Sequence, residues 1–361
     1  MSSGPQQRDQ HRDQELDLER DQECDLTGQL APLLESAPQA TAVALAAVRA
    51  DQRLLLCRGT TARVGGSAVD PGTRFELGSI SKTYTALLLA EAVARGDVRY
   101  HDPIAAYLPA GAVPTHRSGT PITLLHLATH TSGLPRLPPG LLASAVPAWS
   151  TTPYGQYSEH RLLRSLGRCR VGSRPGSRVS YSNLGVGLLG RLLAHAAGTD
   201  YPALLEARVC RPLGLTRTGC GPAPGQATGY WHGRPRPPWQ IPALPGAGAI
   251  RSSAGDLLRY LEALLDPGRA GTLGPALAEV QRLRLVLPRG GDGLCLVWNQ
   301  RPRPRHALLF HTGGTRGFSS FIGYCPGTRT GLAVLANTTP APGSAFLQAA
   351  YSRFRALAEP G

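Results

Sequence analysis

Short apolar stretches typical of strands stand near both ends of the chain, whereas its middle is rich in helical patterns and loops. Each apolar stretch is rich in Val, Leu, Ile, Phe or Ala, has the length of a strand and ends at polar or glycine turn residues. The polar pair Asp51-Gln52 separates the first two stretches, as expected for a tight turn. The pattern predicts five strands, at residues 41–50, 53–60, 306–313, 318–325 and 330–337.

Helical periodicity fills the rest of the chain. A Leu- and Ala-rich helix is predicted from about Ile80 to Arg95, because Gly96 is a typical helix-ending residue. A last helix is predicted over residues 344–359, and a short one begins at about Leu26. The predicted fold class is α+β, a five-stranded antiparallel sheet flanked by helices with a mostly helical second lobe.

The order of these elements also predicts the domain organisation. Both ends of the chain would build a sheet lobe, at about residues 25–98 and 290–361. The helical lobe, at about residues 99–289, would be inserted between them, so that residues 25–361 form one domain. A cleft between two such lobes is the expected place for chemistry.

Charge is distributed unevenly along the 361 residues, whose formal net charge is +14. Residues 1–24 carry three Arg against seven acids, a net of −4, which leaves +18 on the rest. The repeats in this segment lack apolar periodicity and predict a disordered acidic tail, which could fold over the basic body and compete with anionic substrates. The remaining arginines are dispersed without stacking aromatics, so no nucleic-acid partner is expected.

Other composition features exclude several classes of protein. The seven cysteines are odd in number and never form a C-x-x-C pair, which disfavours a disulfide framework or a zinc site. No metal ligand set and no cofactor is predicted. No apolar run approaches the ~20 residues that span a bilayer, and the first residues lack an apolar segment of the secretory type. We therefore expect a cytoplasmic protein without a membrane partner.

One lysine stands among 37 arginines, at position 82, three residues after Ser79. This i, i+3 spacing places both side chains on one helical face. A serine hydroxyl needs a neighbouring base to become a nucleophile, and a lysine can be held neutral whereas an arginine cannot. The helix N-terminus beside Ser79 adds backbone N–H groups suited to an oxyanion. Alone, S-x-x-K is common by chance.

Two further motifs carry polar groups of the same kind. Tyr181-Ser182-Asn183 stands just before a predicted helix, where a phenol could move a proton and an amide could orient a carbonyl. By itself the triplet equally suits a buried tyrosine and a helix cap. His311-Thr312-Gly313-Gly314 ends a predicted strand, and its glycines allow close approach of a ligand to the backbone.

In this order, S-x-x-K, Y-x-N and H-T-G resemble the penicillin-recognising serine enzymes. The chain is similar to the branch containing class C β-lactamases, DD-peptidases and esterases, from about residue 40 to 355. Further stretches share the likeness, among them "ITLLHLATHTSGLP", "GSRVSYSNLGVGLLGRLL" and "HTGGTRGFSS".

The resemblance implies a role for each motif residue. Ser79 would be acylated, Lys82 would be its base or proton relay, and Tyr181 would be the second general acid/base. Asn183 would hold a substrate amide or carbonyl. His311, Thr312 and Gly313 would line the edge strand along which the substrate main chain lies. The backbone N–H groups of Ser79 and Gly314 would bind the oxyanion.

The implied activity is hydrolysis of an ester or amide of a small molecule or D-amino-acid peptide, through an acylated Ser79. A β-lactamase, a D-alanyl-D-alanine carboxypeptidase or an acyltransferase is the alternative, and a non-catalytic penicillin-binding relative is the other class. His311 replaces the lysine of many lactamases, and a neutral imidazole attracts a carboxylate less. The sequence therefore favours a small-molecule acyl substrate and leaves that substrate and the oligomeric state open.

Overall fold

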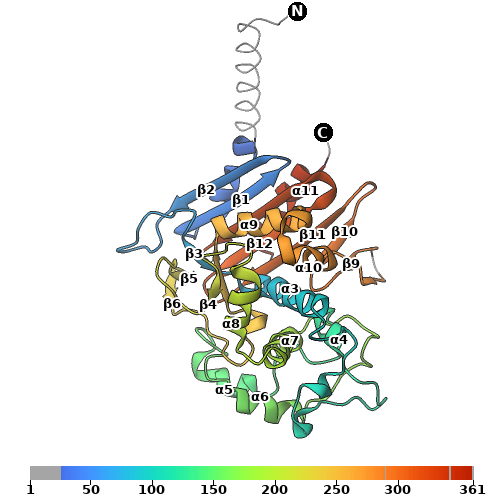
Figure 1. The fold of residues 1–361 in the computed structure, drawn as a ribbon. Coiled ribbons are helices and arrows are strands. Elements are labelled where there is room, and N and C mark those ends of the chain that lie inside the picture. Colours follow the sequence, from blue (N-terminus) through green and yellow to red (C-terminus); the bar gives the residue numbers. More distant parts are fainter. Residues whose placement is uncertain (1–25, 289, 341–342, 360–361) are drawn as a thin grey trace, which may run out of the picture.

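The computed structural model describes residues 26–288, 290–340 and 343–359. The predicted acidic tail, residues 1–24, lies outside the described residues. Figure 1 shows a large sheet with helices on both faces and a helical region beside it. Among the described residues, no helix combines the length and the apolar character that crossing a bilayer requires.

The main sheet is antiparallel and has the strand order β2-β1-β13-β12-β11-β10-β9-β8. Strands from both ends of the chain pair in it, since Val43 of β1 lies opposite Ala336 of β13. The predicted α+β antiparallel fold is confirmed. The strands are β1 (Ala42–Arg49), β2 (Gln52–Gly59), β8 (Leu285–Val286), β9 (Gly293–Leu294), β10 (Asn299–Pro302), β11 (Ala307–Gly314), β12 (Ser319–Cys325) and β13 (Thr330–Ala336).

The predicted number of five strands is wrong, because the sheet has eight. The five predicted strands form the continuous block from β2 to β11, and three more extend it beyond β11. These three are two to four residues long, and the longest reads Asn-Gln-Arg-Pro. Strands this short show no alternating pattern, so only pairing with a neighbouring strand defines them.

Both faces of the sheet are covered. Along β1, Val43 and Leu45 pack into the core beneath α2 (Pro32–Glu35) and α11 (Ala345–Ala358). The alternate residues Ala44 and Ala46 face the other core, with α9 (Ala254–Leu265) and α3 (Ser81–Ala94). Since successive side chains of a strand point to opposite faces, a strand buried on both sides reads as a continuous apolar run.

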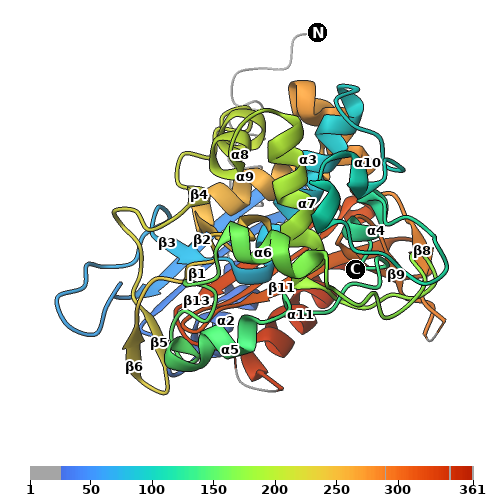
Figure 2. The same ribbon diagram turned by 90° about the horizontal axis from the view of Figure 1, so that it is seen from below.

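Helix α3 joins the sheet to the helical region. Residues 81–91 are all buried, and the helix ends before Gly96, whose φ is +80°. The helix predicted from about residue 80 to 95 is thus confirmed. Its neighbour on the helical side is α7 (Asn183–Ala196), and Figure 2 shows the two side by side.

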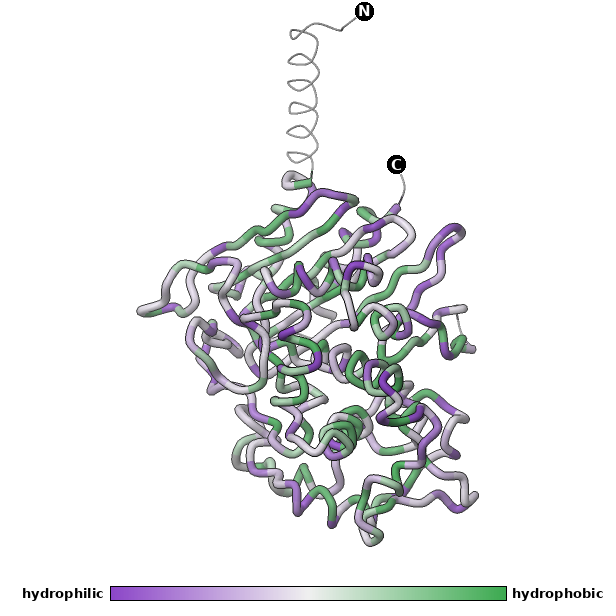
Figure 3. The backbone as a smooth tube through the Cα atoms, in the orientation of Figure 1, coloured by the Kyte–Doolittle hydropathy of each residue, from purple (hydrophilic) through white to green (hydrophobic). Residues whose placement is uncertain are grey.

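Shorter elements complete the fold, and the predicted division into two lobes stays a prediction. Figure 3 shows apolar stretches along the central strands and polar ones at turns and loop tips. The other helices are α4 (Leu124–Ala128), α5 (Leu141–Ala145), α6 (Glu159–Leu166), α8 (Tyr201–Leu205) and α10 (Gly274–Glu279). The small sheets contain β3 (Arg74–Glu76), β4 (Gly219–Cys220) and β7 (Ile250–Ser253), and β5 (Gly229–Trp231) with β6 (Arg234–Arg236).

Candidate active site

The three motifs meet at one cleft with a volume of about 690 Å³. Lys82 is fully buried beneath it, one helical turn beyond Ser79. Every other predicted site residue lines the cleft, namely Ser79, Tyr181, Asn183, His311, Thr312, Gly313 and Gly314. Residues more than 200 positions apart in the chain are therefore brought together.

A close backbone contact places Ser79. The residue lies in a 3₁₀ turn (Gly78–Ile80) that runs directly into α3. Gly78 has φ +52°, and a Cβ atom there would lie 2.6 Å from the Gly314 nitrogen. Only glycine combines this backbone conformation with this contact. The nucleophile turn therefore packs directly on the end of β11.

Ser79 Oγ sits between two proton-carrying groups. The Nζ atom of Lys82 lies 3.0 Å from it, and the Tyr181 hydroxyl lies 2.7 Å from it. The Lys82 Nζ atom is also 5.1 Å from the centre of the Tyr181 ring. Both distances to Oγ are those of hydrogen bonds, so a proton can move among the three side chains without rearrangement.

Burial changes the acid–base character of Lys82. Desolvation lowers the pKa of Lys82, the neighbouring Tyr181 opposes that shift, and the nearby Arg136 adds to it. Its Nζ atom also donates to the Ala247 carbonyl oxygen at 2.6 Å. A neutral amine can keep that bond and still accept the Ser79 proton with its lone pair. The site thus favours the form that can act as a base.

The segment before α7 fixes the Tyr181 ring. Ser182 caps α7 by accepting from the Gly185 N–H, and its own hydroxyl donates to the Pro135 carbonyl. The Ser182 N–H donates to His130 Nδ1, and the His130 ring lies 4.6 Å from the Tyr181 ring centre. Burial, with Lys82 nearby, lowers the pKa of His130 to about 3, so this support stays neutral.

One edge of β11 is free along the cleft. Strand β10 pairs only with residues 307–310 of β11, so the part from His311 to Gly314 has no partner on that side among the described residues. Thr315 N–H donates inward to Phe318. Because N–H groups of successive residues in a strand alternate in direction, the Gly314 N–H points to the free edge. This edge can bind an extended substrate backbone.

His311 is buried and uncharged at neutral pH. Its Nδ1 atom lies 2.7 Å from the Thr312 carbonyl oxygen, which can only accept, so Nδ1 carries the ring proton. Burial, with Lys82 nearby, lowers the pKa of His311 to about 4. The side chain therefore contributes a polar surface and no cation to the cleft.

Asn183 presents an unused acceptor. Its Nδ2 atom donates to the Tyr154 hydroxyl at 3.3 Å, while its buried Oδ1 atom has no partner among the described residues. A buried polar atom without a partner is uncommon. A substrate N–H group in the cleft would satisfy it.

Sequence reasoning missed several groups around the site, among them the Ala247 carbonyl and Glu76. The Ala247 carbonyl, the second Lys82 partner, left no signal because it is a backbone atom. The buried Glu76 was detectable, as an acidic residue in an otherwise apolar stretch before Ser79. Its carboxylate accepts from the Trp239 N–H at 2.6 Å and the Thr315 hydroxyl at 2.7 Å, and it pairs with Arg251.

No cluster of three or more potential metal ligands occurs among the residues that the structure describes. His126 and His130, which stand four residues apart in the sequence, have local roles. His126 Nδ1 accepts from the Thr123 N–H at the start of α4, and His130 supports Ser182 as described above.

Comparisons with known proteins point to one family. The family model described as Beta-lactamase matches residues 30–356. The D-alanyl-D-alanine-carboxypeptidase/endopeptidase AmpH of Escherichia coli K12 is 31% identical over 317 residues, covering 83% of this chain and 80% of AmpH. A Beta-lactamase of the same strain is 27% identical, covering 79% of this chain and 80% of that protein. A Beta-lactamase of Pseudomonas fluorescens is 29% identical, covering 74% of this chain and 80% of that protein.

Proposed function

The chain belongs to the Beta-lactamase family and is a serine hydrolase that works through an acyl-enzyme, and we propose that Ser79 carries the acyl group. The family predicted from the three motifs is confirmed. One observation carries the assignment: Ser79 Oγ lies within hydrogen-bonding distance of both Lys82 and Tyr181 and faces the free edge of β11.

Acylation begins with transfer of the Ser79 hydroxyl proton to the neutral amine of Lys82. Oγ then attacks the carbonyl carbon of an ester or amide, and the carbonyl oxygen becomes an oxyanion. The backbone N–H groups of Ser79 and Gly314 stabilise that charge. Tyr181 gives its proton to the departing oxygen or nitrogen as the bond to the acyl carbon breaks, and Lys82 returns a proton to Tyr181.

Deacylation uses the same groups in the opposite direction. Lys82, which is a neutral amine again after acylation, takes a proton from water through Tyr181, which passes its own proton to Lys82 as it accepts one from the water. The water oxygen attacks the acyl carbon and forms a second tetrahedral intermediate. Collapse of that intermediate releases the carboxylic acid and returns the proton to Ser79 Oγ. One pair of side chains thus serves both half-reactions.

The substrate is an ester or a short D-amino-acid peptide whose backbone extends along β11. Asn183 Oδ1 accepts one of its N–H groups, and the neutral His311 lines the edge beside it. A D-alanyl-D-alanine peptide, the substrate type in the full name of AmpH, fits this arrangement of main-chain donors and acceptors. A β-lactam would acylate the same serine. Slow hydrolysis of that adduct would indicate a peptidase, and fast hydrolysis would indicate a β-lactamase.

Intact-mass spectrometry tests the proposal. The wild type and Ser79→Ala are incubated with a fluorescent penicillin, with p-nitrophenyl valerate and with a D-alanyl-D-alanine tripeptide. We expect an adduct on the wild type that decays as product appears, and neither adduct nor turnover with Ser79→Ala. Full turnover by a folded Ser79→Ala variant would refute the assignment. A permanent adduct without turnover would favour a penicillin-binding role.

A further inference from the structure

The walls of the active-site cleft carry positive charge without any acidic residue. Of the residues that line it, Arg136 and Arg316 are charged, and none is Asp or Glu. Neither guanidinium takes part in an ion pair within the described part of the chain. In a chain rich in paired arginines, two unneutralised ones at the reaction site indicate a charged ligand.

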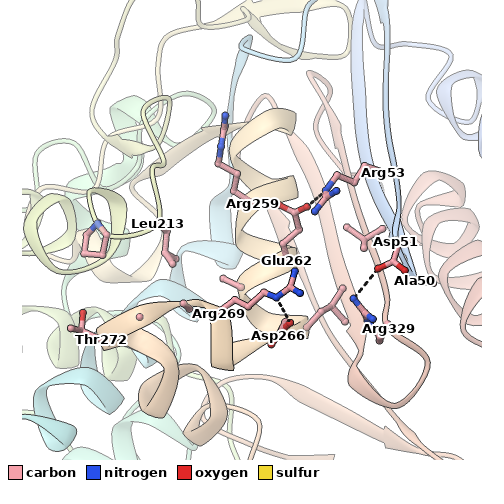
Figure 4. Close-up of a pocket in the computed structure, with 16 residues that line it drawn as sticks. Ala50, Asp51, Arg53, Leu213, Arg259, Glu262, Asp266, Arg269, Thr272 and Arg329 are labelled. Carbon is pink, nitrogen blue, oxygen red and sulfur yellow. Dashed lines mark hydrogen bonds and ion pairs between the residues drawn. The ribbon is translucent and has the colours of Figure 1, made fainter.

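A second cavity, of about 650 Å³, shows the contrast. It lies between the β1–β2 turn and helix α9, and three of its four arginines pair with acids that line the same cavity (Figure 4). The fourth, Arg259, pairs with Asp256, which does not line it. The pairs there are Arg53–Glu262, Arg269–Asp266 and Arg329–Asp51. Positive charge in that cavity is neutralised by the protein itself, whereas in the active-site cleft it is not.

Arg316 is held in place by two tryptophans. Its guanidinium carbon lies 5.2 Å from the ring centre of Trp149 and 5.1 Å from that of Trp231. These are cation–π distances. Neither ring offers a hydrogen-bond acceptor of the carboxylate kind, so the guanidinium N–H groups stay available to a carboxylate. The side chain is half-buried and therefore partly desolvated before any ligand arrives.

Its position along the chain places Arg316 at one end of the cleft. It stands two residues after Gly314, in the turn between β11 and β12. At the opposite end of the free edge, the buried His311 offers no charge near neutral pH. Arg316 is thus a fixed cation beyond the oxyanion position.

We propose that Arg316 binds an anionic group of the substrate, a carboxylate, at the end of the cleft beyond Gly314. This inference rests on the proposed function, whose substrate class it narrows to acidic esters or peptides. Arg136 has a different place. Its guanidinium carbon lies 5.3 Å from the Tyr181 ring centre, so its charge acts on the proton-transfer groups.

The test compares two esters of equal acyl length, p-nitrophenyl hydrogen glutarate and p-nitrophenyl valerate. We expect the wild type to prefer the glutarate ester, and Arg316→Gln to lower the ratio of the two kcat/KM values by about 10-fold or more, as for loss of a charge-assisted hydrogen bond. Arg63→Gln is the matched control, because Arg63 also contacts an aromatic ring, 5.1 Å from the Tyr230 ring centre, and does not line the cleft. It should leave the ratio within about twofold.

A second pair, phenyl valerate and 3-carboxyphenyl valerate, moves the charge to the leaving group. Loss of preference in either pair with Arg316→Gln supports the proposal and shows which half of the substrate carries the anion. Unchanged ratios in both pairs, or an equal effect of Arg63→Gln, would overturn it while Ser79-dependent turnover still stands.

Absence of Ser79-dependent turnover with all four esters would instead be a failure of the proposed function. In that case tryptophan fluorescence decides the inference, since Trp149 and Trp231 flank Arg316. Titration with glutarate should give a saturable change in the wild type that is lost in Arg316→Gln. The same titration curve in both proteins would overturn the proposal.

Discussion

Replacing Lys82 by arginine separates two roles that a buried cation could have at this site. An arginine keeps the positive charge and can still donate to the Ala247 carbonyl. It cannot accept the Ser79 proton, because a guanidinium does not deprotonate in proteins. If Lys82 acts as the base, Lys82→Arg removes its function. If it supplies only a positive field, Lys82→Arg preserves it.

The magnitude follows from the contacts of Nζ. The 3.0 Å distance to Ser79 Oγ allows direct proton transfer. Loss of a positioned general base lowers a rate by roughly 100- to 10,000-fold. The bond to Ala247 is a separate quantity, since a carbonyl left without its donor reduces the free energy of unfolding by about 1–3 kcal/mol. Lys82→Ala would show both losses, whereas Lys82→Arg should show mainly the first.

The assay is the second-order rate constant for acylation by a fluorescent penicillin, measured across neutral and alkaline pH. Because burial lowers the pKa of Lys82 below 10.5, the wild-type rate should rise with pH through that lowered value as the neutral amine forms. Lys82→Arg should lack this rise. In the same window the unfolded chain binds more protons than the folded one, so the free energy of unfolding of the wild type should also rise with pH.

The reasoning would be refuted by a Lys82→Arg variant that retains at least about half of the wild-type acylation rate. A control measurement of thermal unfolding is needed, because a larger side chain in a fully buried site can strain the fold. Lys82→Ala with added methylamine is the second variant. An acylation rate of Lys82→Ala that rises in proportion to the concentration of neutral methylamine would support the base role even if Lys82→Arg failed to fold.

Two further outcomes follow from the same geometry. Tyr181→Phe removes the 2.7 Å bond to Ser79 Oγ and should lower kcat/KM about 100- to 10,000-fold, with a change of about 1 kcal/mol in the free energy of unfolding; a wild-type kcat would contradict the acid–base role. Glu76→Ala leaves the buried Arg251 unpaired and should reduce the free energy of unfolding by about 3–5 kcal/mol, as measured by urea denaturation. The double variant Glu76→Gln/Arg251→Met should lose less free energy of unfolding than Glu76→Ala alone. A loss equal to the sum of the losses of the two single variants would show that the two side chains are not coupled.

Local patterns carried much of the fold and the site. The five longest strands were predictable because an apolar run of about eight residues between turn signals has few alternatives to a strand. The spacing of Ser79 and Lys82 was informative because i, i+3 residues share one face of a helix whatever surrounds it. The sole lysine added chemical meaning, since the surrounding arginines cannot exchange a proton.

Other features depended on contacts that local sequence does not encode. Strand β10 pairs with β11, β9 pairs with β10 and β8 pairs with β9, and their short sequences carry no strand pattern. The pairing of β10 with β11 ends before His311 and so leaves the substrate edge free. Pairing partners in a sheet are distant in the chain, so their register is decided by packing.

The sequence by itself determined which side chains could do the chemistry: one serine, one lysine that can lose its proton, and a tyrosine, in the order of a known family. The tertiary structure alone decided that Lys82 is fully buried and that Ser79 lies within 3.0 Å of both partners. It also decided that Arg316 stands between two tryptophans, with no acidic partner among the described residues. The physical reason is that burial, desolvation and charge pairing are set by residues far apart in the chain, which meet only when the sheet and the helices pack together.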